Sequence, residues 1–317
     1  MVALPSTYQP NDGTILEWRI YPPGWTYHAS PSPTPTPAPG PGVIVEHGGN
    51  WNAGDPFQPD IERVCQILAQ SGFWVFSPSY RLAPCGRITH QPPHGGNTLT
   101  GNPSGRPPQQ TDDLMFAMLA ARNSTQCTGH KVGILGSSVG GFLAAYVALY
   151  RHNISGTGRP QWHGGGDDSQ DYRPDCIATF SSPFDISDQE TDDPTLFAVY
   201  IGSLQNYVGN CSLTDARNAS PISLINGSDT AQNFKPMFIV QADDDDTNPH
   251  RQLDNITIAL NDAGVDACDY PVKHVTTRTQ GHAIILWPQP DPNPDSGHEG
   301  DSIGDSALRF SHDHLDN

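Results

Sequence analysis

Gly136-Ser137-Ser138-Val139-Gly140 decides the fold of this chain, because of what stands on either side of it. The apolar run from Val132 to Leu135 before it is typical of a buried strand. The segment after it has the spacing of a helix whose apolar face carries Phe142, Ala145, Tyr146 and Leu149. Glycines two positions either side of Ser138 permit a turn too tight for Cβ atoms, which lifts the serine hydroxyl to where a base can reach it. The stretch therefore predicts a strand, a sharp turn and a helix that present Ser138.

Strands and helices are expected to alternate on both sides of this unit. Strand-like segments occupy residues 14–21, 43–45, 73–76, 132–135, 176–180, 237–241 and 270–275. Helical patterns occupy residues 59–70, a segment capped by Thr111, and residues 142–149 and 253–260, with short helices at 194–201 and 219–222. Such alternation implies βαβ units, so the sequence predicts the α/β class with a mostly parallel central sheet flanked by helices.

The 317 residues suffice for one large domain, expected to span residues 1–317 with its core at about 14–287. The proline-rich segment 30–42 is expected to be an extended loop, since too little chain precedes it to form a separate domain. Residues 85–110 show no periodicity and predict a long inserted loop near the site. The polar, acidic segment 288–317 is expected to be a loosely attached tail.

Charge and hydropathy exclude two classes of partner. The formal net charge is −18, from 34 acidic and 16 basic residues, which disfavours binding to nucleic acid. The sequence contains no apolar run of 18 residues, so no membrane span is predicted. The oligomeric state is left open.

The cysteines and glycosylation sequons favour an extracellular protein. Six cysteines without Cys-x-x-Cys spacing permit up to three disulfides, although small buried core residues are the alternative. Asn-x-Ser/Thr sequons occur at Asn123, Asn153, Asn210, Asn218, Asn226 and Asn255. The segment after Met1 lacks the pattern of a signal peptide, as a mature secreted chain would.

A serine hydroxyl becomes a nucleophile at neutral pH only when a histidine accepts its proton, and that histidine needs a carboxylate to orient it. His282 lies just past the last predicted strand and is the candidate base; His274, inside that strand, is expected to pack or to face solvent. The candidate acids are Asp243, Asp244, Asp245 and Asp246, which follow the strand at 237–241. Their position alone does not choose among the four.

Two segments are candidates for an oxyanion hole. The backbone N–H of Val139 lies at a helix N-terminus, where the dipole favours negative charge. His47-Gly48-Gly49-Asn50 follows a buried strand, and its glycines allow backbone amides to turn inward. A plain glycine-rich turn is the alternative interpretation of that second segment.

Five motifs in this order resemble α/β-hydrolases of the esterase and lipase branch related to hormone-sensitive lipase, and also the feruloyl and acetylxylan esterases. They are His47-Gly48-Gly49-Asn50-Trp51, Tyr80-Arg81-Leu82-Ala83-Pro84, Gly136 to Gly141, the acidic loop ending at Pro249, and Gly281-His282.

The resemblance implies that Ser138 is the nucleophile, His282 the base and Asp245 the acid, four residues before Pro249. It also implies that Gly49, Asn50 and Val139 donate the oxyanion amides. Four positions depart from the family pattern: Asn50 stands in place of glycine and Val139 in place of alanine, while Ala242 and Asn248 replace the glycine and valine of the acid loop.

The function expected from these residues is a secreted serine carboxylic ester hydrolase that acts on short acyl or aryl esters, with acetyl or feruloyl groups on polysaccharide as candidates. No cofactor or metal is implied. A serine peptidase of the same fold and a non-catalytic binding protein are the alternatives. A complete set of nucleophile, base and acid favours catalysis over binding alone.

Overall fold

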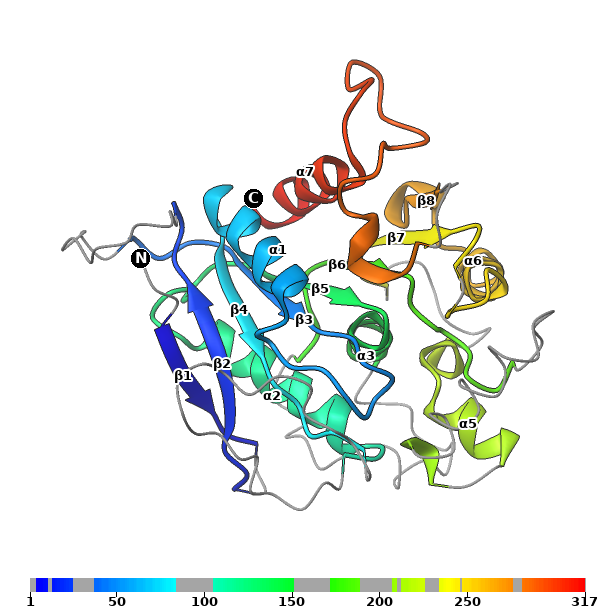
Figure 1. Ribbon diagram of the computed structural model, residues 1–317, viewed down its shortest axis with the longest axis horizontal. Helices are drawn as coiled ribbons and strands as arrows, with labels where there is room; N and C mark the ends of the chain where they lie inside the picture. The colour runs from blue at the N-terminus through cyan, green and yellow to red at the C-terminus, as the bar shows by residue number, and fades with distance from the viewer. Residues whose placement is uncertain are drawn as a thin grey trace.

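An eight-stranded sheet forms the centre of the protein (Figure 1). The computed structural model describes residues 4–10, 13–24, 37–83, 105–150, 172–188, 207–209, 212–225, 234–245, 247–275 and 281–316. The strands are β1 (Leu4–Tyr8), β2 (Leu16–Tyr21), β3 (Gly42–Glu46), β4 (Trp74–Pro78), β5 (Val132–Ser137), β6 (Ile177–Phe180), β7 (Met237–Ala242) and β8 (Val272–Val275). Their order in the sheet is β1-β2-β4-β3-β5-β6-β7-β8.

From β4 to β8 every neighbouring pair of strands is parallel, and only the β1–β2 and β2–β4 pairs are antiparallel. Parallel strands place their carboxyl ends at one edge of the sheet, and Glu46 at the end of β3 pairs in register with Gly136 of β5. The loop after β3 therefore lies beside the turn that carries Ser138. The expected α/β class with a mostly parallel sheet is confirmed.

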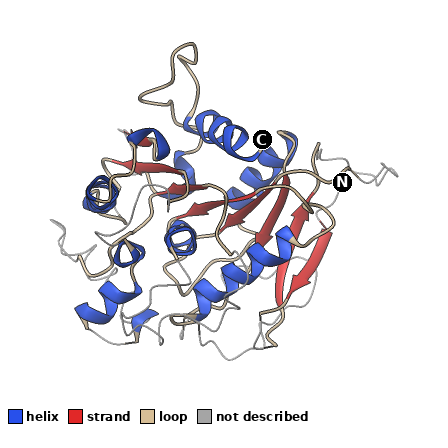
Figure 2. Ribbon diagram, turned by 180° about the vertical axis from the view of Figure 1, so that it is seen from behind, coloured by secondary structure: helices blue, strands red, loops and turns tan. Residues whose placement is uncertain are grey.

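Helices cover both faces of this sheet (Figures 1 and 2). One core contains α1 (Pro59–Gln70), η5 (Ala283–Leu286) and α7 (Ile303–Leu315). The other contains α2 (Gln109–Arg122), α3 (Val139–Leu149), α5 (Leu213–Ala219), η2 (Pro221–Leu224) and α6 (Arg251–Asp262). Successive residues of a strand point to opposite faces, so Val43 and Val45 belong to the α1 core and Ile44 to the α3 core.

The C-terminal segment is not the loose tail that the sequence predicts. Residues 288–317 were expected to form a loosely attached tail, but α7 packs there and buries Ile303, Ala307, Phe310 and Leu315. The ring of Phe310 lies 5.6 Å from that of Phe238 on β7. Ser302 caps the helix with a capping box, because its side chain accepts from Asp305 N–H while the Asp305 carboxylate accepts from Ser302 N–H. The segment is therefore part of the fold.

Two other expectations about helices and loops are wrong. Thr111 does not cap α2, which begins at Gln109; the Thr111 hydroxyl donates instead to Pro108 O at 2.7 Å inside the first turn. The long loop expected at 85–110 ends earlier, because Gln109 and Gln110 belong to α2. Residues 85–104 of that loop, residues 30–36 of the proline-rich loop and the helix expected at 194–201 lie outside the described residues. A single domain over residues 1–317 stays a prediction.

The described cysteines do not form a disulfide framework. Cys65, Cys127, Cys176 and Cys268 are free thiols, and the first three are buried, as the core-residue alternative predicts. Burial raises the pKa of Cys127 to about 12, so this thiol stays protonated and unreactive at neutral pH. Cys85 and Cys211 lie outside the described residues. None of the helices in the described ranges is long and apolar enough to cross a membrane.

Candidate active site

Ser138 stands on a strained turn between β5 and α3. Its backbone has φ 55° and ψ −120°, a region that costs L-residues free energy and persists only where the surroundings enforce it. A Cβ on Gly136 would lie 2.4 Å from Gly140 O, and one on Gly140 would lie 2.3 Å from Glu46 O. Both glycines are therefore required sterically. Ser138 N–H donates to Phe180 O at 2.8 Å, which ties the turn to β6.

His282 forms hydrogen bonds with both the serine and a carboxylate. Its Nε2 lies 2.9 Å from Ser138 Oγ, and its Nδ1 lies 2.8 and 2.9 Å from the two carboxylate oxygens of Asp245. The Asp245 side chain is 1% exposed and that of His282 24% exposed. The structure thus brings together the three residues that the sequence singled out.

The loop after β7 distinguishes Asp245 from its acidic neighbours. The Asp245 carboxylate accepts hydrogen bonds from the backbone N–H groups of Thr247 (2.9 Å) and Asn248 (2.8 Å). Asp243 instead pairs with His274, and both side chains are exposed. Asp246 lies outside the described residues. These two backbone donors hold the Asp245 carboxylate in position beside His282.

Gln241, which sequence reasoning missed, organises the same loop. It is buried at the carboxyl end of β7, and its Nε2 donates to Asp245 Oδ2 and to Asn248 O, each at 3.1 Å. Its Oε1 accepts from Asn248 Nδ2 at 3.0 Å. A polar residue that ends an otherwise apolar strand, four residues before the candidate acid, was the available signal.

The segment from Gly48 to Asn50 lies against the serine turn. Gly48 O accepts from His47 Nδ1 at 2.8 Å, and Gly49 O accepts from Asn52 and Ala53 N–H at 3.1 and 2.9 Å. In a trans peptide the N–H points opposite to the C=O. Since both carbonyls are held by the loop, the amides of Gly49 and Asn50 point away from those partners. Positive φ angles of 127° at Gly49 and 52° at Asn50 produce this arrangement.

Val139 provides the other predicted amide. It is the first residue of α3, whose first hydrogen bonds run from Gly141 and Phe142 N–H to Ser138 O. The N–H groups ahead of these have no partner within the helix, and the helix dipole makes them attractive to an anion. Gly48, absent from the predicted set, packs directly against the turn, because a Cβ on it would lie 3.0 Å from Ser138 Cβ.

Buried polar groups contact the loop after β3. Burial lowers the pKa of His47 to about 4, so the ring is neutral at pH 7 and can donate from Nδ1 to Gly48 O. The ring stacks on Tyr80 with centroids 4.4 Å apart. Burial and the nearby Asp113 carboxylate raise the pKa of Glu46 well above its usual range, against a smaller opposing effect of the His47 backbone N–H.

The segment Tyr80-Arg81-Leu82-Ala83 anchors the same loop through α2. The Arg81 guanidinium binds the buried Asp113 carboxylate, with Nη2 at 2.6 Å from Oδ1, and Arg81 N–H donates to the other oxygen at 2.9 Å. Trp51 O accepts from Ala83 N–H at 2.8 Å and from Gln110 Nε2 at 2.7 Å. This motif therefore has a structural role: it holds Trp51, and with it the loop after β3, against α2.

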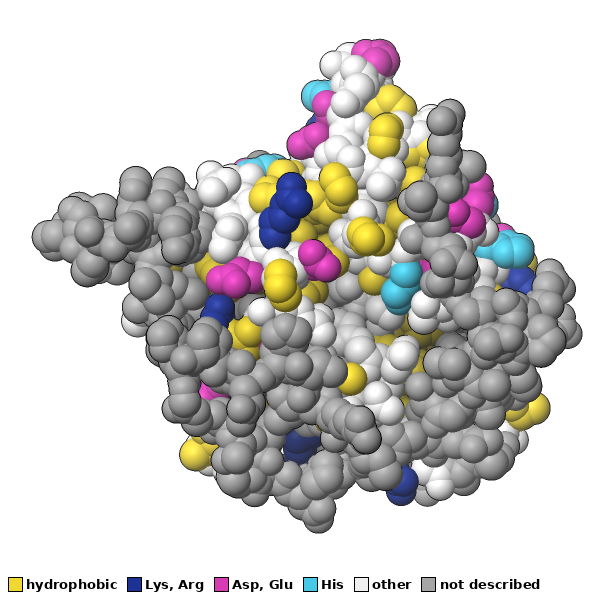
Figure 3. Space-filling view, viewed as in Figure 1, with side chains coloured by type: hydrophobic (Ala, Val, Ile, Leu, Met, Phe, Trp, Pro, Cys, Tyr) yellow, Lys and Arg dark blue, Asp and Glu magenta, His cyan; other side chains and the backbone are white. Residues whose placement is uncertain are grey.

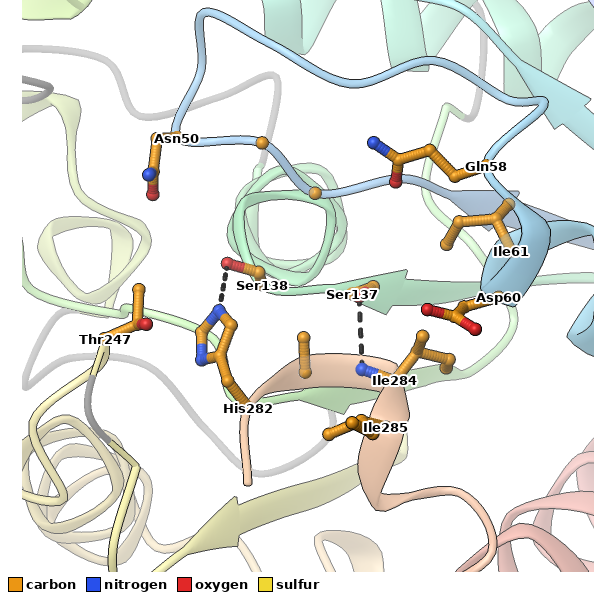
Figure 4. Close-up of a pocket in the computed structure, with 13 residues that line it drawn as sticks. Asn50, Gln58, Asp60, Ile61, Ser137, Ser138, Thr247, His282, Ile284 and Ile285 are labelled. Carbon is orange, nitrogen blue, oxygen red and sulfur yellow. Dashed lines mark hydrogen bonds between the residues drawn. The ribbon is translucent and has the colours of Figure 1, made fainter. Parts of the chain in front are cut away.

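A cavity of about 370 Å³ opens over Ser138 (Figure 4). Its polar wall includes Asn50, Gln58, Asp60 and Thr247, and its apolar wall includes Ile61, Ala283, Ile284 and Ile285. Ile284 N–H donates to Ser137 Oγ at 3.3 Å, which fixes the segment after His282 to the serine turn. Sequence reasoning missed this lining, although Ile284 and Ile285 stand two and three residues after the candidate base and Asp60 is the second residue of a predicted helix.

The described residues contain no group of three or more His, Cys, Asp or Glu side chains arranged to hold a metal ion. What the site can do chemically rests on its proton-transfer groups, its backbone amides and its cavity.

Solved structures of esterases have the same fold. A butyrate-bound esterase from the planctomycete Thermogutta terrifontis matches at 17% identity and a TM-score of 0.60, over 98% of this chain and 92% of that one. Esterase B of Lactobacillus rhamnosis matches at 18% identity and a TM-score of 0.63, over 97% and 84% of the two chains. A hyperthermophilic esterase of the archaeon Pyrobaculum calidifontis matches at 20% identity and a TM-score of 0.59, over 88% and 77%.

At such identities the structural likeness shows the α/β-hydrolase fold. No curated protein matches the sequence. The family model of the dienelactone hydrolases matches residues 26–191, which include the loop after β3 and the serine turn. The chain therefore belongs to the dienelactone hydrolase family and is a carboxylic ester hydrolase.

Proposed function

We propose that Ser138, His282 and Asp245 are the nucleophile, base and acid of a serine esterase. The observation that carries the proposal is the continuous hydrogen-bond chain through His282, from Ser138 Oγ at 2.9 Å to Asp245 at 2.8 Å. Asp245 fixes the tautomer with the proton on Nδ1, which leaves the Nε2 lone pair to accept the serine proton. The strained turn holds Oγ in place before substrate arrives.

The reaction follows from this arrangement in two halves. Ser138 Oγ attacks the ester carbonyl carbon while its proton moves to His282 Nε2, and the carbonyl oxygen becomes an oxyanion. The C–O bond to the alcohol then breaks as Nε2 returns the proton to the leaving oxygen. Water, deprotonated by His282, attacks the acyl-enzyme and releases the acid and Ser138.

The backbone amides of Gly49, Asn50 and Val139 are the proposed oxyanion donors. Each donor aimed at the developing charge contributes about 3 kcal/mol to transition-state stabilisation. Their support from the His47 ring, the Trp51 carbonyl and the α3 N-terminus keeps them oriented before the reaction.

Short acyl or aryl esters are the proposed substrates. The cavity of about 370 Å³ accommodates a small ester, and solved Thermogutta esterase structures hold propionate or butyrate. The likeness of the motifs to hormone-sensitive-lipase-like and feruloyl or acetylxylan esterases belongs to this proposal, as does an acetyl or feruloyl group linked to polysaccharide.

A p-nitrophenyl ester series from acetate to palmitate tests the proposal. Turnover that falls steeply beyond short chains, and that is lost in Ser138→Ala, is the expected result. Ser311→Ala on α7 is the matched control, because within the described part of the chain its hydroxyl donates to its own helix, at 2.8 Å to Ala307 O. Hydrolysis retained by Ser138→Ala would overturn the assignment of the nucleophile, and a maximum at palmitate would overturn the short-ester preference.

An extracellular location is proposed on the acidic charge and the sequons, since the free thiols of the described cysteines lend it no support. Fractionation of the producing cells, with detection in the medium and loss of mass on deglycosylation, tests it. Protein found only in the cell lysate would contradict it.

A further inference from the structure

A second, smaller cavity lies beside the one over Ser138. This second cavity has a volume of about 80 Å³ and shares three lining residues with the first: Asp60, Ile284 and Ile285. Its remaining lining residues are Arg63, Val64, Trp287 and Pro288. The shared residues place the two cavities side by side, and we call the space that these residues line between α1 and η5 the α1 arm. A substrate group that extends beyond the triad in this direction enters the α1 arm.

Asp60 lies at the junction of the two cavities. In the larger cavity it is, with His282, one of only two titratable side chains among the described lining residues, and no lysine or arginine lines that cavity. Figure 4 shows its carboxylate turned from the start of α1 toward the space beside Ser137 and Ile284. An acidic residue in a first turn also interacts well with the helix dipole, but that interaction does not require the side chain to turn into the cavity.

Apolar side chains lie on the same side of the cavity as this carboxylate. Ile61, Ile284 and Ile285 line the cavity there, and Asp60 and Ile285 are both exposed at its mouth. Apolar side chains also gather between α1 and the orange segment containing η5 on the face shown in Figure 3. A negative charge beside apolar lining residues suits a cation that is bulky and weakly hydrated better than a compact, strongly hydrated ammonium.

We propose that Asp60 makes the α1 arm a subsite for a quaternary-ammonium-like cation on the ester substrate. The inference rests on the proposed esterase function and names a substrate class for it. Arg63, one turn further along α1, lines the far cavity and opposes a cation there, so the positive centre binds at the junction and not beyond it. Esters that place an anionic group beside Asp60 are disfavoured by the same carboxylate.

Two matched substrate pairs test the inference, each comparing a cation with its neutral isostere. On the alcohol side the pair is acetylthiocholine and S-3,3-dimethylbutyl thioacetate. On the acyl side it is the p-nitrophenyl esters of 4-trimethylammoniobutyrate and 5,5-dimethylhexanoate. The readout is the ratio of kcat/KM for cation over isostere, which cancels effects of a substitution on folding or on the triad. Whichever pair shows the preference identifies the part of the ester that enters the arm.

The cationic ester is expected to be preferred by about fivefold at low salt, which corresponds to one charge pair near contact distance through water. Asp60→Asn is expected to bring the ratio near unity, Arg63→Gln to raise it, and added salt to lower it. Asp262→Asn, at an exposed site on α6, is the control for a charge change far from the pocket. Equal ratios in Asp60→Asn and the unmodified protein for both pairs would overturn the inference.

A binding measurement separates this inference from the proposed function. Calorimetric titration with phenyltrimethylammonium is expected to give a dissociation constant that rises severalfold in Asp60→Asn and falls in Arg63→Gln. If no ester is turned over, the esterase proposal fails while this titration still decides the role of Asp60. The same affinity in all three proteins, or no binding to any of them, would overturn the cation subsite.

Discussion

At the scale of single residues, His47 makes the stability of the protein depend on pH. Its ring is neutral in the fold because burial lowers its pKa from 6.5 to about 4. Between these values the unfolded chain takes up a proton that the folded protein does not, so the free energy of unfolding falls as pH drops through this window. Integrated over the window, the loss is about 3 kcal/mol.

Urea unfolding of the unmodified protein and His47→Gln at pH 7.5, 5.5 and 4.5 measures this effect. The variant is expected to be less stable at pH 7.5, since it loses the stack on Tyr80. The difference in free energy of unfolding between the two proteins is expected to narrow as pH falls. Other groups titrate equally in both proteins, so the difference isolates His47. A difference in free energy of unfolding that stays constant with pH would contradict the lowered pKa of His47.

Gln241 is expected to act on catalysis through Asp245. Gln241→Leu removes the donor to Asp245 Oδ2 and frees the Asn248 side chain, and one lost hydrogen bond to a charged group corresponds to about a tenfold fall in kcat. KM is expected to stay close to its original value, because Gln241 does not line the cavity.

Steady-state kinetics on a short p-nitrophenyl ester, beside thermal unfolding, measure this effect. Gln252→Leu is the comparison, since it removes another buried glutamine on α6 that bonds Phe184 and Asp185 and not the acid. A loss of stability with unchanged kcat in Gln241→Leu would leave the residue a purely structural role.

At the scale of elements, the packing of α7 is expected to contribute strongly to the free energy of unfolding. Phe310→Ala removes a ring packed against Phe238 in the core between α7 and the sheet. The expected loss is about 3–5 kcal/mol of the free energy of unfolding. Denaturant unfolding measures it, with Asp313→Asn at an exposed position of the same helix as the control. A loss no larger than that of the control would mean that α7 can detach without cost to the fold.

The helices also show what the sequence could and could not predict. The range expected for α1, 59–70, agrees with the structure, because Ile61, Val64, Cys65 and Leu68 repeat at helical spacing after Pro59 at the first position. In α7 the same periodicity exists at Ile303, Ala307 and Phe310, but serine, aspartate and histidine between them lower the mean hydropathy. The capping box at Ser302 was the signal to follow.

The nucleophile turn was readable in the sequence because sterics tie each of its glycines to one geometry. The pocket was not, since Asp60, Gln58 and Ile285 meet only through the packing of α1 beside η5. Among the four consecutive aspartates, the sequence offered spacing from Pro249 through a resemblance, whereas the physical reason for Asp245 is its backbone donors. Such donors depend on the path of the loop, which local sequence does not set.

At the scale of the whole molecule, the formal net charge of −18 acts against compactness. Like charges repel more in the folded protein than in the expanded chain, and salt screens that repulsion over about 10 Å at 0.1 M. Raising sodium chloride from about 0.01 to 0.3 M is therefore expected to raise the urea midpoint of unfolding. A midpoint that falls with salt would mean that ion pairs such as Arg81–Asp113 outweigh the repulsion.

The position of Ser138 between the two cores has a consequence for following how the molecule assembles. Ser138 directly precedes α3, which packs on one face of the sheet, while the segment that carries His282 leads into η5, whose Ile284 and Leu286 pack on the other. In the proposed mechanism, Oγ is nucleophilic only when the two layers are docked closely enough for Nε2 to reach it. The rate at which a fluorophosphonate labels Ser138 during refolding therefore reports when the two layers dock. Circular dichroism reports a different event, because it detects helices that have formed but have not yet packed against each other.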